Sequence, residues 1–229
     1  INFLSYDDAY SPPKTVEQTR KLVEQDEIFA NFGSLGTATN TAIHKYMNQK
    51  KVPHLFVSTG ASKWDDPKNF PYTIPLYPNY VMEGRVAGKY IVQTKPDGKI
   101  AILYQNDDSG KDYVKGFKEG LGDKVKNIVI EKTYEVSDPT LDSQMVAIKR
   151  SGADVFFAMS TPKFGAQAIK KSAELNWKPL YYVVSVSSSI KGVLEPAGVE
   201  NSKGLVTAIA GKIPADPRWN DSADMKEFL

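Results

Sequence analysis

Short apolar runs alternate with helix-length amphipathic stretches along the chain, and this alternation limits the fold more than any other feature. Runs such as residues 100–103 and 155–159 have the length and composition of buried strands. The stretches between them repeat apolar positions at helical spacing. Strands separated by helices pair in parallel through right-handed crossovers. The sequence therefore predicts an α/β protein with doubly wound parallel sheets, which bind ligands beyond the carboxyl ends of their strands.

The expected elements cover most of the chain. Strands are expected over residues 1–6, 28–32, 55–58, 72–76, 99–105, 127–134, 154–159, 180–184 and 204–208. Helices are expected over residues 15–25, 39–50, 79–93, 111–121, 140–151 and 164–175.

Residues 93–98 hold the best candidate for a domain boundary, because Pro96 and Gly98 interrupt a helical pattern before a new series of strands and helices begins. We expect two lobes of similar build. Residues 1–95 form lobe 1 and residues 96–210 form lobe 2 in this division. Residues 211–229 are polar and Pro-rich, and we expect them to be a return crossing towards lobe 1.

Composition excludes several classes of protein. Lysine and arginine number 29 against 27 acidic residues, and the net charge of +2 gives no reason to expect nucleic acid as a partner. The chain has no cysteine and only two histidines, so it offers no disulfide, no thiol nucleophile and no His-rich metal centre. Its longest apolar runs are much shorter than the roughly twenty residues of a membrane helix.

Two loops carry small and hydroxylated residues at the ends of neighbouring strands. Residues 33–40 read G-S-L-G-T-A-T-N and open a helix, where backbone N–H groups and threonine hydroxyls favour an anion such as a carboxylate or a phosphate. Residues 58–63 read S-T-G-A-S-K after the next strand. A tight turn with an N-cap threonine explains the first loop equally well. Convergence of both loops on one crevice favours ligand binding.

Strand ends in the second half would form the opposite wall of such a crevice. Residues 104–110, 158–162 and 184–189 are polar there and include Ser109, Thr161 and Ser187. Trp64, Tyr77 and Tyr80 follow the first two loops and are expected either to line the cleft or to pack the lobes.

The sequence contains no motif for catalysis or for a cofactor. It has no G-x-S-x-G elbow, no H-E-x-x-H and no dinucleotide fingerprint, so we expect a protein that is not an enzyme and holds neither metal nor cofactor. The acidic pairs at 7–8, 65–66 and 107–108 lie in loops, where capping and Asx-turns explain them.

These residues together resemble the branched-chain amino-acid type of periplasmic substrate-binding protein, which has the type I fold of two α/β lobes joined by hinge strands and serves ABC importers. The resemblance covers nearly the whole chain. It rests on Y-D-D at 6–8 before a Pro-containing turn, on the two loops above with the preceding K-V-P-H-L-F-V, and on residues 158–167 leading into a helix. Compared with this family, the chain is expected to lack the first strand–helix unit and the C-terminal part.

The resemblance implies which residues bind ligand. Thr37, with Ala38 in the same turn, matches a hydroxyl and N–H donor to a ligand carboxylate. Gly60 matches a carbonyl and Ser62 another hydroxyl. Thr161 matches a position that faces the ligand from the second lobe. The remaining expected contacts of the cleft are Tyr77, Ser109 and Ser187, with Phe164 as an apolar wall.

The family's amino-acid binders place an acid near positions 185–188, where this chain has S-V-S-S. Because a buried ammonium without a paired acid is costly, we expect a carboxylate ligand without an α-ammonium, most readily an aromatic or apolar organic acid. Asp107 and Asp108 are the alternative partners for an ammonium.

The resemblance further implies a periplasmic or membrane-anchored extracellular monomer that delivers its ligand to an ABC permease. A ligand-sensing domain of a receptor or regulator with the same fold is the alternative, and an enzyme on a doubly wound scaffold is a weaker one.

Overall fold

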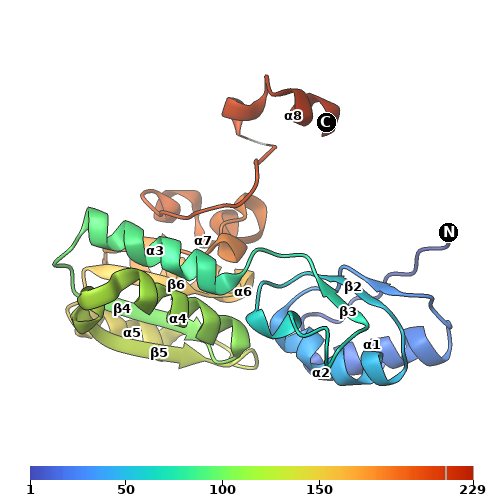
Figure 1. The fold of residues 1–229 in the computed structure, drawn as a ribbon. Helices are drawn as coiled ribbons and strands as arrows, with labels where there is room; N and C mark the ends of the chain where they lie inside the picture. Colours follow the sequence, from blue (N-terminus) through green and yellow to red (C-terminus); the bar gives the residue numbers. More distant parts are fainter. Residues whose placement is uncertain (215, 229) are drawn as a thin grey trace.

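The computed structural model describes residues 1–214 and 216–228 and shows two α/β units side by side (Figure 1). Lobe 1 contains a parallel sheet in the order β1-β2-β3, and lobe 2 a parallel sheet in the order β5-β4-β6-β7. The strands are β1 (Asn31–Phe32), β2 (His54–Val57), β3 (Thr73–Pro75), β4 (Ile100–Gln105), β5 (Ile128–Tyr134), β6 (Val155–Met159) and β7 (Leu180–Val183). The longer helices are α1 (Pro12–Glu24), α2 (Thr37–Gln49), α3 (Tyr80–Thr94), α4 (Asp108–Leu121), α5 (Asp142–Arg150) and α6 (Pro162–Glu174). The type I architecture expected from the sequence is confirmed.

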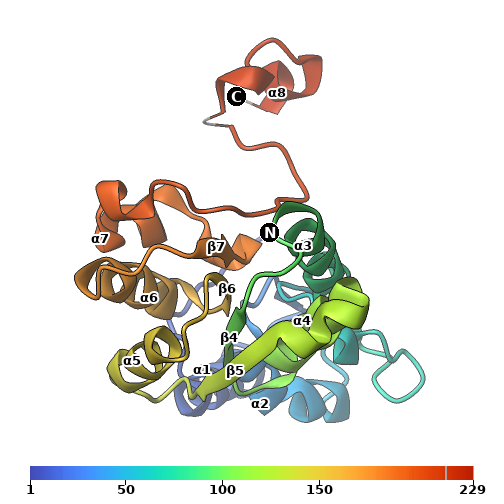
Figure 2. The same cartoon turned by 90° about the vertical axis from the view of Figure 1, so that its left-hand side faces the viewer.

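The central strands of lobe 2 are buried on both faces. All five residues of β6 are buried, and so are Ile100, Ala101, Ile102 and Leu103 of β4. Helices α3 and α4 cover one face of this sheet, while α5 and α6 cover the other (Figure 2). Covering both faces explains why these strands are continuous apolar runs rather than alternating ones.

Helix α3 belongs to lobe 2, which differs from the division expected from the sequence. Glycines of both helices let α3 lie directly against α4: an ideal Cβ at Gly84 of α3 would stand 2.3 Å from the carbonyl oxygen of Tyr113, and one at Gly116 of α4 would stand 1.9 Å from that of Val81. Ala87 and Ile91 join the core beneath the two helices. The chain therefore passes between the lobes at residues 76–79, and the predicted boundary at 93–98 lies within lobe 2.

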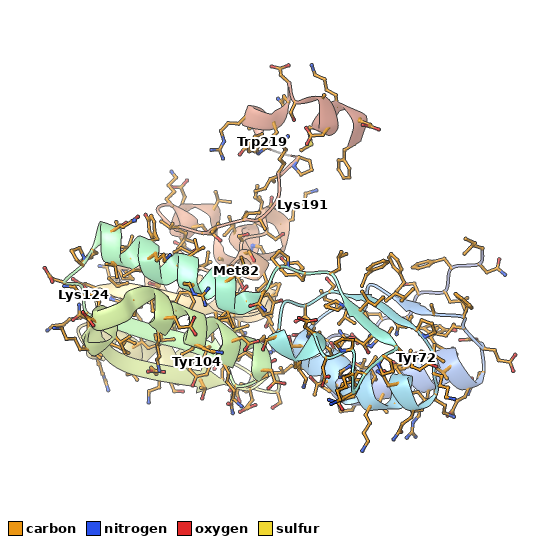
Figure 3. The ribbon with its side chains drawn as sticks, in the orientation of Figure 1. Tyr72, Met82, Tyr104, Lys124, Lys191 and Trp219 are labelled. Atoms are coloured by element: carbon orange, nitrogen blue, oxygen red, sulfur yellow. The ribbon has the colours of Figure 1, made fainter. Side chains whose placement is uncertain are left out.

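Three other expectations at the ends of the lobes differ from the structure. Residues 1–6 form no strand, and Ile1 and Phe3 are largely exposed. The strand expected at 204–208 is reduced to one parallel bridge between Tyr182 and Val206. Beyond it, the segment that carries Trp219 and α8 (Ala223–Phe228) lies apart from both sheets, whereas Tyr72 and Tyr104 belong to lobes 1 and 2 (Figure 3). The return crossing proposed for 211–229 therefore does not reach lobe 1 in the described residues; Ala215 and Leu229 lie outside them.

Several short helical segments complete the chain. They are 3-10 turns at Ser62–Trp64, Gly122–Asn127, Ser185–Ser187, Val199–Ser202 and Pro217–Trp219, a π-helical turn at Ile190–Leu194, and α7 (Glu195–Ala197). None of the helices in residues 1–214 and 216–228 combines the length and apolarity needed to cross a membrane.

Candidate ligand-binding cleft

The two hydroxyl-rich loops of lobe 1 meet, as parallel strands require. Gly36, with φ +93°, ends the first loop, and α2 begins at Thr37. The Thr37 hydroxyl is buried and lies 2.5 Å from that of Thr59, which follows β2. The first turn of a helix leaves its N–H groups without intrahelical acceptors. Thr37 and Ala38 therefore present donors and a hydroxyl at the carboxyl edge of the sheet.

A buried polar network holds the first loop rigid. The Asn40 amide donates to the carbonyl oxygens of Ser34 at 3.0 Å and Gly36 at 2.6 Å. The Nε2 atom of His54 lies 2.7 Å from Ser34 Oγ and 2.9 Å from Asn40 Oδ1. Burial lowers the pKa of His54 to about 4, so its imidazole is neutral at pH 7. This network pre-organises the turn at the start of α2.

Tyr10 packs against this turn. Its ring lies against Gly36, where an ideal Cβ would approach Tyr10 Cε2 to 2.3 Å. Burial raises the pKa of Tyr10 to about 12, while hydrogen bonds from the Gln105 side chain and the Thr37 backbone act in the opposite direction. Tyr10 therefore packs directly on the turn that begins α2. Sequence analysis missed it because nothing local distinguishes a tyrosine in a Pro-containing turn.

A second tyrosine, Tyr80, closes the other side of the loops. Burial raises the pKa of Tyr80 to about 12, against hydrogen bonds to the Gly60 backbone and the Thr59 side chain. The backbone N–H of Tyr80 donates to the Gly60 carbonyl at 2.9 Å. The carbonyl proposed to face a ligand is therefore engaged with the first residue of α3. Tyr77, the expected contact nearby, is exposed and lies edge-on to Tyr80 at 5.9 Å between ring centroids.

Lobe 2 presents a connected polar wall at the ends of β4, β5 and β6. The Tyr134 hydroxyl accepts from the Thr161 N–H at 3.0 Å and donates to Gln105 Oε1 at 3.2 Å. The Gln105 amide then donates to Asp107 Oδ2 at 2.7 Å. Burial raises the pKa of Tyr134 well above its usual value. Thr161 thus lies in the wall where the sequence placed it, whereas Gln105 and Tyr134 were not predicted.

Two predicted serines turn inward. Ser109 is buried and donates to Asp107 Oδ1 at 2.5 Å, next to the N-cap bond that Asp107 accepts from the Gly110 N–H. Ser187 is fully buried and bonded to Ser160. Their hydroxyls have partners within lobe 2, and their proposed contacts with a ligand require a rearrangement of these bonds. Phe164 is also buried, with its ring 4.3 Å from that of Tyr134.

An acid does reach the 185–188 loop, from a distant part of the chain. Glu83 of α3 accepts from the Ser185 N–H at 2.7 Å and the Ser185 hydroxyl at 2.9 Å, and from the Tyr113 hydroxyl at 2.6 Å. Burial raises the pKa of Glu83 despite these donors. Its oxygens are engaged by three donors within lobe 2, so it is not a free partner for a ligand ammonium.

Charged contacts join the two lobes next to the second loop. The Ser62 N–H donates to Asp112 Oδ2 at 2.6 Å, and its hydroxyl donates to Asp112 Oδ1 at 3.1 Å. Lys63 pairs with Asp108 Oδ2 at 2.7 Å. In the described part of the chain, no group of three or more His, Asp or Glu side chains is arranged to hold a metal ion.

The fold and this site, with two parallel-sheet lobes facing each other across polar strand ends, define a bilobal ligand-binding protein. The chain belongs to the periplasmic binding protein family, whose profile matches residues 1–227. It is 22% identical over 180 residues to a Leu/Ile/Val-binding protein homolog 7 of Brucella abortus, a match that covers 75% of this chain and 45% of the relative. The chain thus spans about half the length of the curated relatives it matches.

Two solved structures show the same fold. One is an ABC-transporter solute-binding protein from R. palustris in complex with benzoate, with TM-score 0.83 and 20% identity over 100% of this chain and 61% of that one. The other is a fatty acid ABC transporter substrate-binding protein from Thermomonospora curvata, with TM-score 0.78 and 17% identity over 98% of this chain and 56% of that one.

Proposed function

We propose that the chain is the ligand-binding part of an extracytoplasmic solute-binding protein that captures a small carboxylate between its lobes and delivers it to an ABC importer. The observation that carries this proposal is the pair of polar strand ends, one in each lobe: the buried Thr37 and Thr59 hydroxyls lie 2.5 Å apart in lobe 1, and the Tyr134 hydroxyl joins the Thr161 N–H to the Gln105 side chain in lobe 2. A cleft with polar strand ends on both walls is the usual ligand site of doubly wound folds.

The donors of lobe 1 suit a carboxylate. The Thr37 hydroxyl and the N–H groups of Thr37 and Ala38 lie at the positive end of α2, where an anion is favoured. A neutral His54 and the phenols of Tyr10 and Tyr80 add no charge at pH 7, since their pKa values are about 4 and about 12. A single carboxylate is therefore the charge that this wall accommodates best.

The other end of the ligand is proposed to be aromatic or apolar. Glu83 is the acid nearest the 185–188 loop, and three donors within lobe 2 already engage it, so an ammonium at this loop would have to compete with Tyr113 and Ser185. Benzoate in one structural relative and fatty acid in the name of another are consistent with such a ligand. An amino acid, as in the name of the Brucella relatives, is the second candidate, and its ammonium would have to displace Ser185 or Tyr113 from Glu83.

Matched pairs of ligands test this proposal by isothermal titration calorimetry. We expect phenylpropionate to bind more tightly than phenylalanine, and 4-methylvalerate more tightly than leucine, with no turnover of any of them. Tighter binding of both amino acids would assign the protein to the amino-acid branch. A broad panel of carboxylates that neither binds nor stabilises the chain would contradict the proposal as a whole.

The remaining properties follow from this role. The lobes are proposed to close by motion about the crossing at residues 76–79, as hinged binding proteins do. A monomer in the periplasm, or anchored at the outer face of a membrane, fits delivery to a permease.

A further inference from the structure

Two carboxylates of α4 reach across the rim of the cleft to two consecutive residues of lobe 1. Asp112 accepts both donors of Ser62, its N–H at 2.6 Å and its hydroxyl at 3.1 Å. Asp108 pairs with Lys63 at 2.7 Å, and the same ammonium donates to Thr41 Oγ1 at 3.1 Å. Residues four apart lie on one face of a helix, so both carboxylates face lobe 1 together.

Neither carboxylate is needed to build α4. Asp107 is the N-cap and accepts from the Gly110 N–H, so the capping role that the sequence assigned to the 107–108 pair belongs to Asp107 alone. Asp108 lies in the first turn, where a negative charge helps the helix slightly, but its carboxylate is directed to Lys63. Asp112 has both oxygens on Ser62.

We propose that Ser62 and Lys63 of lobe 1 and Asp108 and Asp112 of α4 form a rim latch that holds the two lobes closed. The Ser62–Asp112 half consists of two hydrogen bonds to a charged acceptor, which are stronger than neutral ones. The Lys63–Asp108 half is a partly exposed ion pair, with side chains 30% and 46% exposed, and is weakened by salt.

The latch changes the role of Ser62. The resemblance made its hydroxyl a donor to the ligand, but here the chain's own Asp112 carboxylate accepts from both the hydroxyl and the N–H of Ser62. A ligand carboxylate could bind Ser62 only by displacing the Asp112 carboxylate from it. The negative charges of Asp108 and Asp112 would also repel the ligand carboxylate. Thr37 is left as the hydroxyl of the carboxylate subsite. This consequence rests on the proposed function, whereas the latch itself does not.

The distance between the lobes can be measured without any ligand. The chain has no native cysteine, so fluorophores placed through Lys68→Cys in lobe 1 and Lys115→Cys on α4, both exposed, are site-specific. Single-molecule energy transfer in the full chain then gives the ratio of closed to open molecules. Asp123→Asn, which changes an exposed carboxylate elsewhere on lobe 2, is the matched control.

We expect Asp112→Asn to lower the closed-to-open ratio by about ten-fold, the effect of losing hydrogen bonds to a charged acceptor. Ser62→Ala keeps the N–H donor and should lower the ratio less, by about three-fold. The Ser62→Ala and Asp112→Asn effects should not add in the double variant, because they remove the same contact. Lys63→Met should open the lobes at low salt and have little effect at 1 M salt.

An unchanged ratio in Asp112→Asn, an equal change in Asp123→Asn, or full additivity of the Ser62 and Asp112 effects would overturn the latch. Circular dichroism of each variant checks that it is folded. If Asp112→Asn opens the lobes while no carboxylate binds, the latch stands and the proposed ligand class fails. If carboxylates bind and Asp112→Asn leaves the ratio unchanged, the proposed function stands and the latch fails.

Discussion

Acid should destabilise this protein through His54, the buried imidazole behind the turn at Thr37. Its pKa is lowered from 6.5 to about 4, chiefly by burial and secondarily by the nearby His44. The neutral ring is favoured in the folded state, because the residue is fully buried and its Nδ1 has no hydrogen-bond partner, while Nε2 is bonded to Ser34 and Asn40. The unfolded chain binds a proton at this residue well before the folded chain does.

The sign and size follow from linkage. Above pH 6.5 the histidine is neutral in both states and contributes nothing to the pH dependence. As the pH falls from 6.5 towards 4, only the unfolded state gains the proton, and the free energy of unfolding decreases. The two pKa values give a loss of about 2 kcal/mol between pH 8 and pH 5 for His54 alone. With a urea slope of about 2 kcal/mol/M, the unfolding midpoint should fall by about 1 M.

Urea unfolding of the wild type and of His54→Gln at pH 8 and pH 5 measures this effect. His54→Gln should be less stable than the wild type at both pH 8 and pH 5, but it should lose less stability than the wild type when the pH is lowered. His44, whose pKa burial also lowers to about 4, remains in that variant, and His44→Gln with His54→Gln should be flatter still. Glu83 acts in the opposite sense, because its raised pKa favours the protonated folded form at low pH. If the free energy of unfolding changed with pH by the same amount in the wild type and in the double variant, the reasoning would be refuted.

Two further substitutions test the site and the packing that supports it. Thr37→Ala should weaken carboxylate binding by about 1.5–3 kcal/mol, the value of a hydrogen bond to a charged group, whereas Thr37→Ser should retain most of the affinity. Calorimetric titration with phenylpropionate measures both variants. Equal affinities of Thr37→Ala and the wild type would remove Thr37 from the site. Gly116→Ala should destabilise the protein by about 1–3 kcal/mol in thermal or urea unfolding, since the new Cβ would lie 1.9 Å from the Val81 carbonyl oxygen. Gly211→Ala, which meets nothing within 4 Å, is the control and should change stability little.

The secondary structure was predictable because each element of lobe 2 carries its own burial pattern. The runs at 100–105 and 155–159 have the pattern of strands buried on both faces. The expected helices 79–93 and 164–175 match α3 and α6 to within a few residues. Residues 1–6 carry the same apolar pattern, but in the structure they have no neighbouring strand to pair with and form none. A strand needs its partner, and a helix does not.

The assignment of α3 to a lobe was not predictable from breakers alone. Pro96 and Gly98 correctly predict where α3 ends. The lobe to which α3 belongs depends instead on which helix its glycines contact. Gly84 and Gly88 lie against the backbone of α4, a contact made by residues about thirty positions away.

The sequence by itself determined the strand-end loops of the site. Thr37 follows β1 and Ser62 follows β2, and in a parallel sheet the carboxyl ends of neighbouring strands share one edge whatever the rest of the fold does. Fold class, loop position and hydroxyl chemistry are local properties of the chain or follow from parallel pairing.

Only the tertiary structure decided which partners those loops have. Ser62 meets Asp112, 50 positions away, and Glu83 meets Ser185, 102 positions away. Such contacts leave no periodic signal, because each depends on the mutual placement of two lobes and on the rotamer of a single side chain. The sequence therefore specifies the donors of the cleft, whereas the fold determines which acceptors reach them.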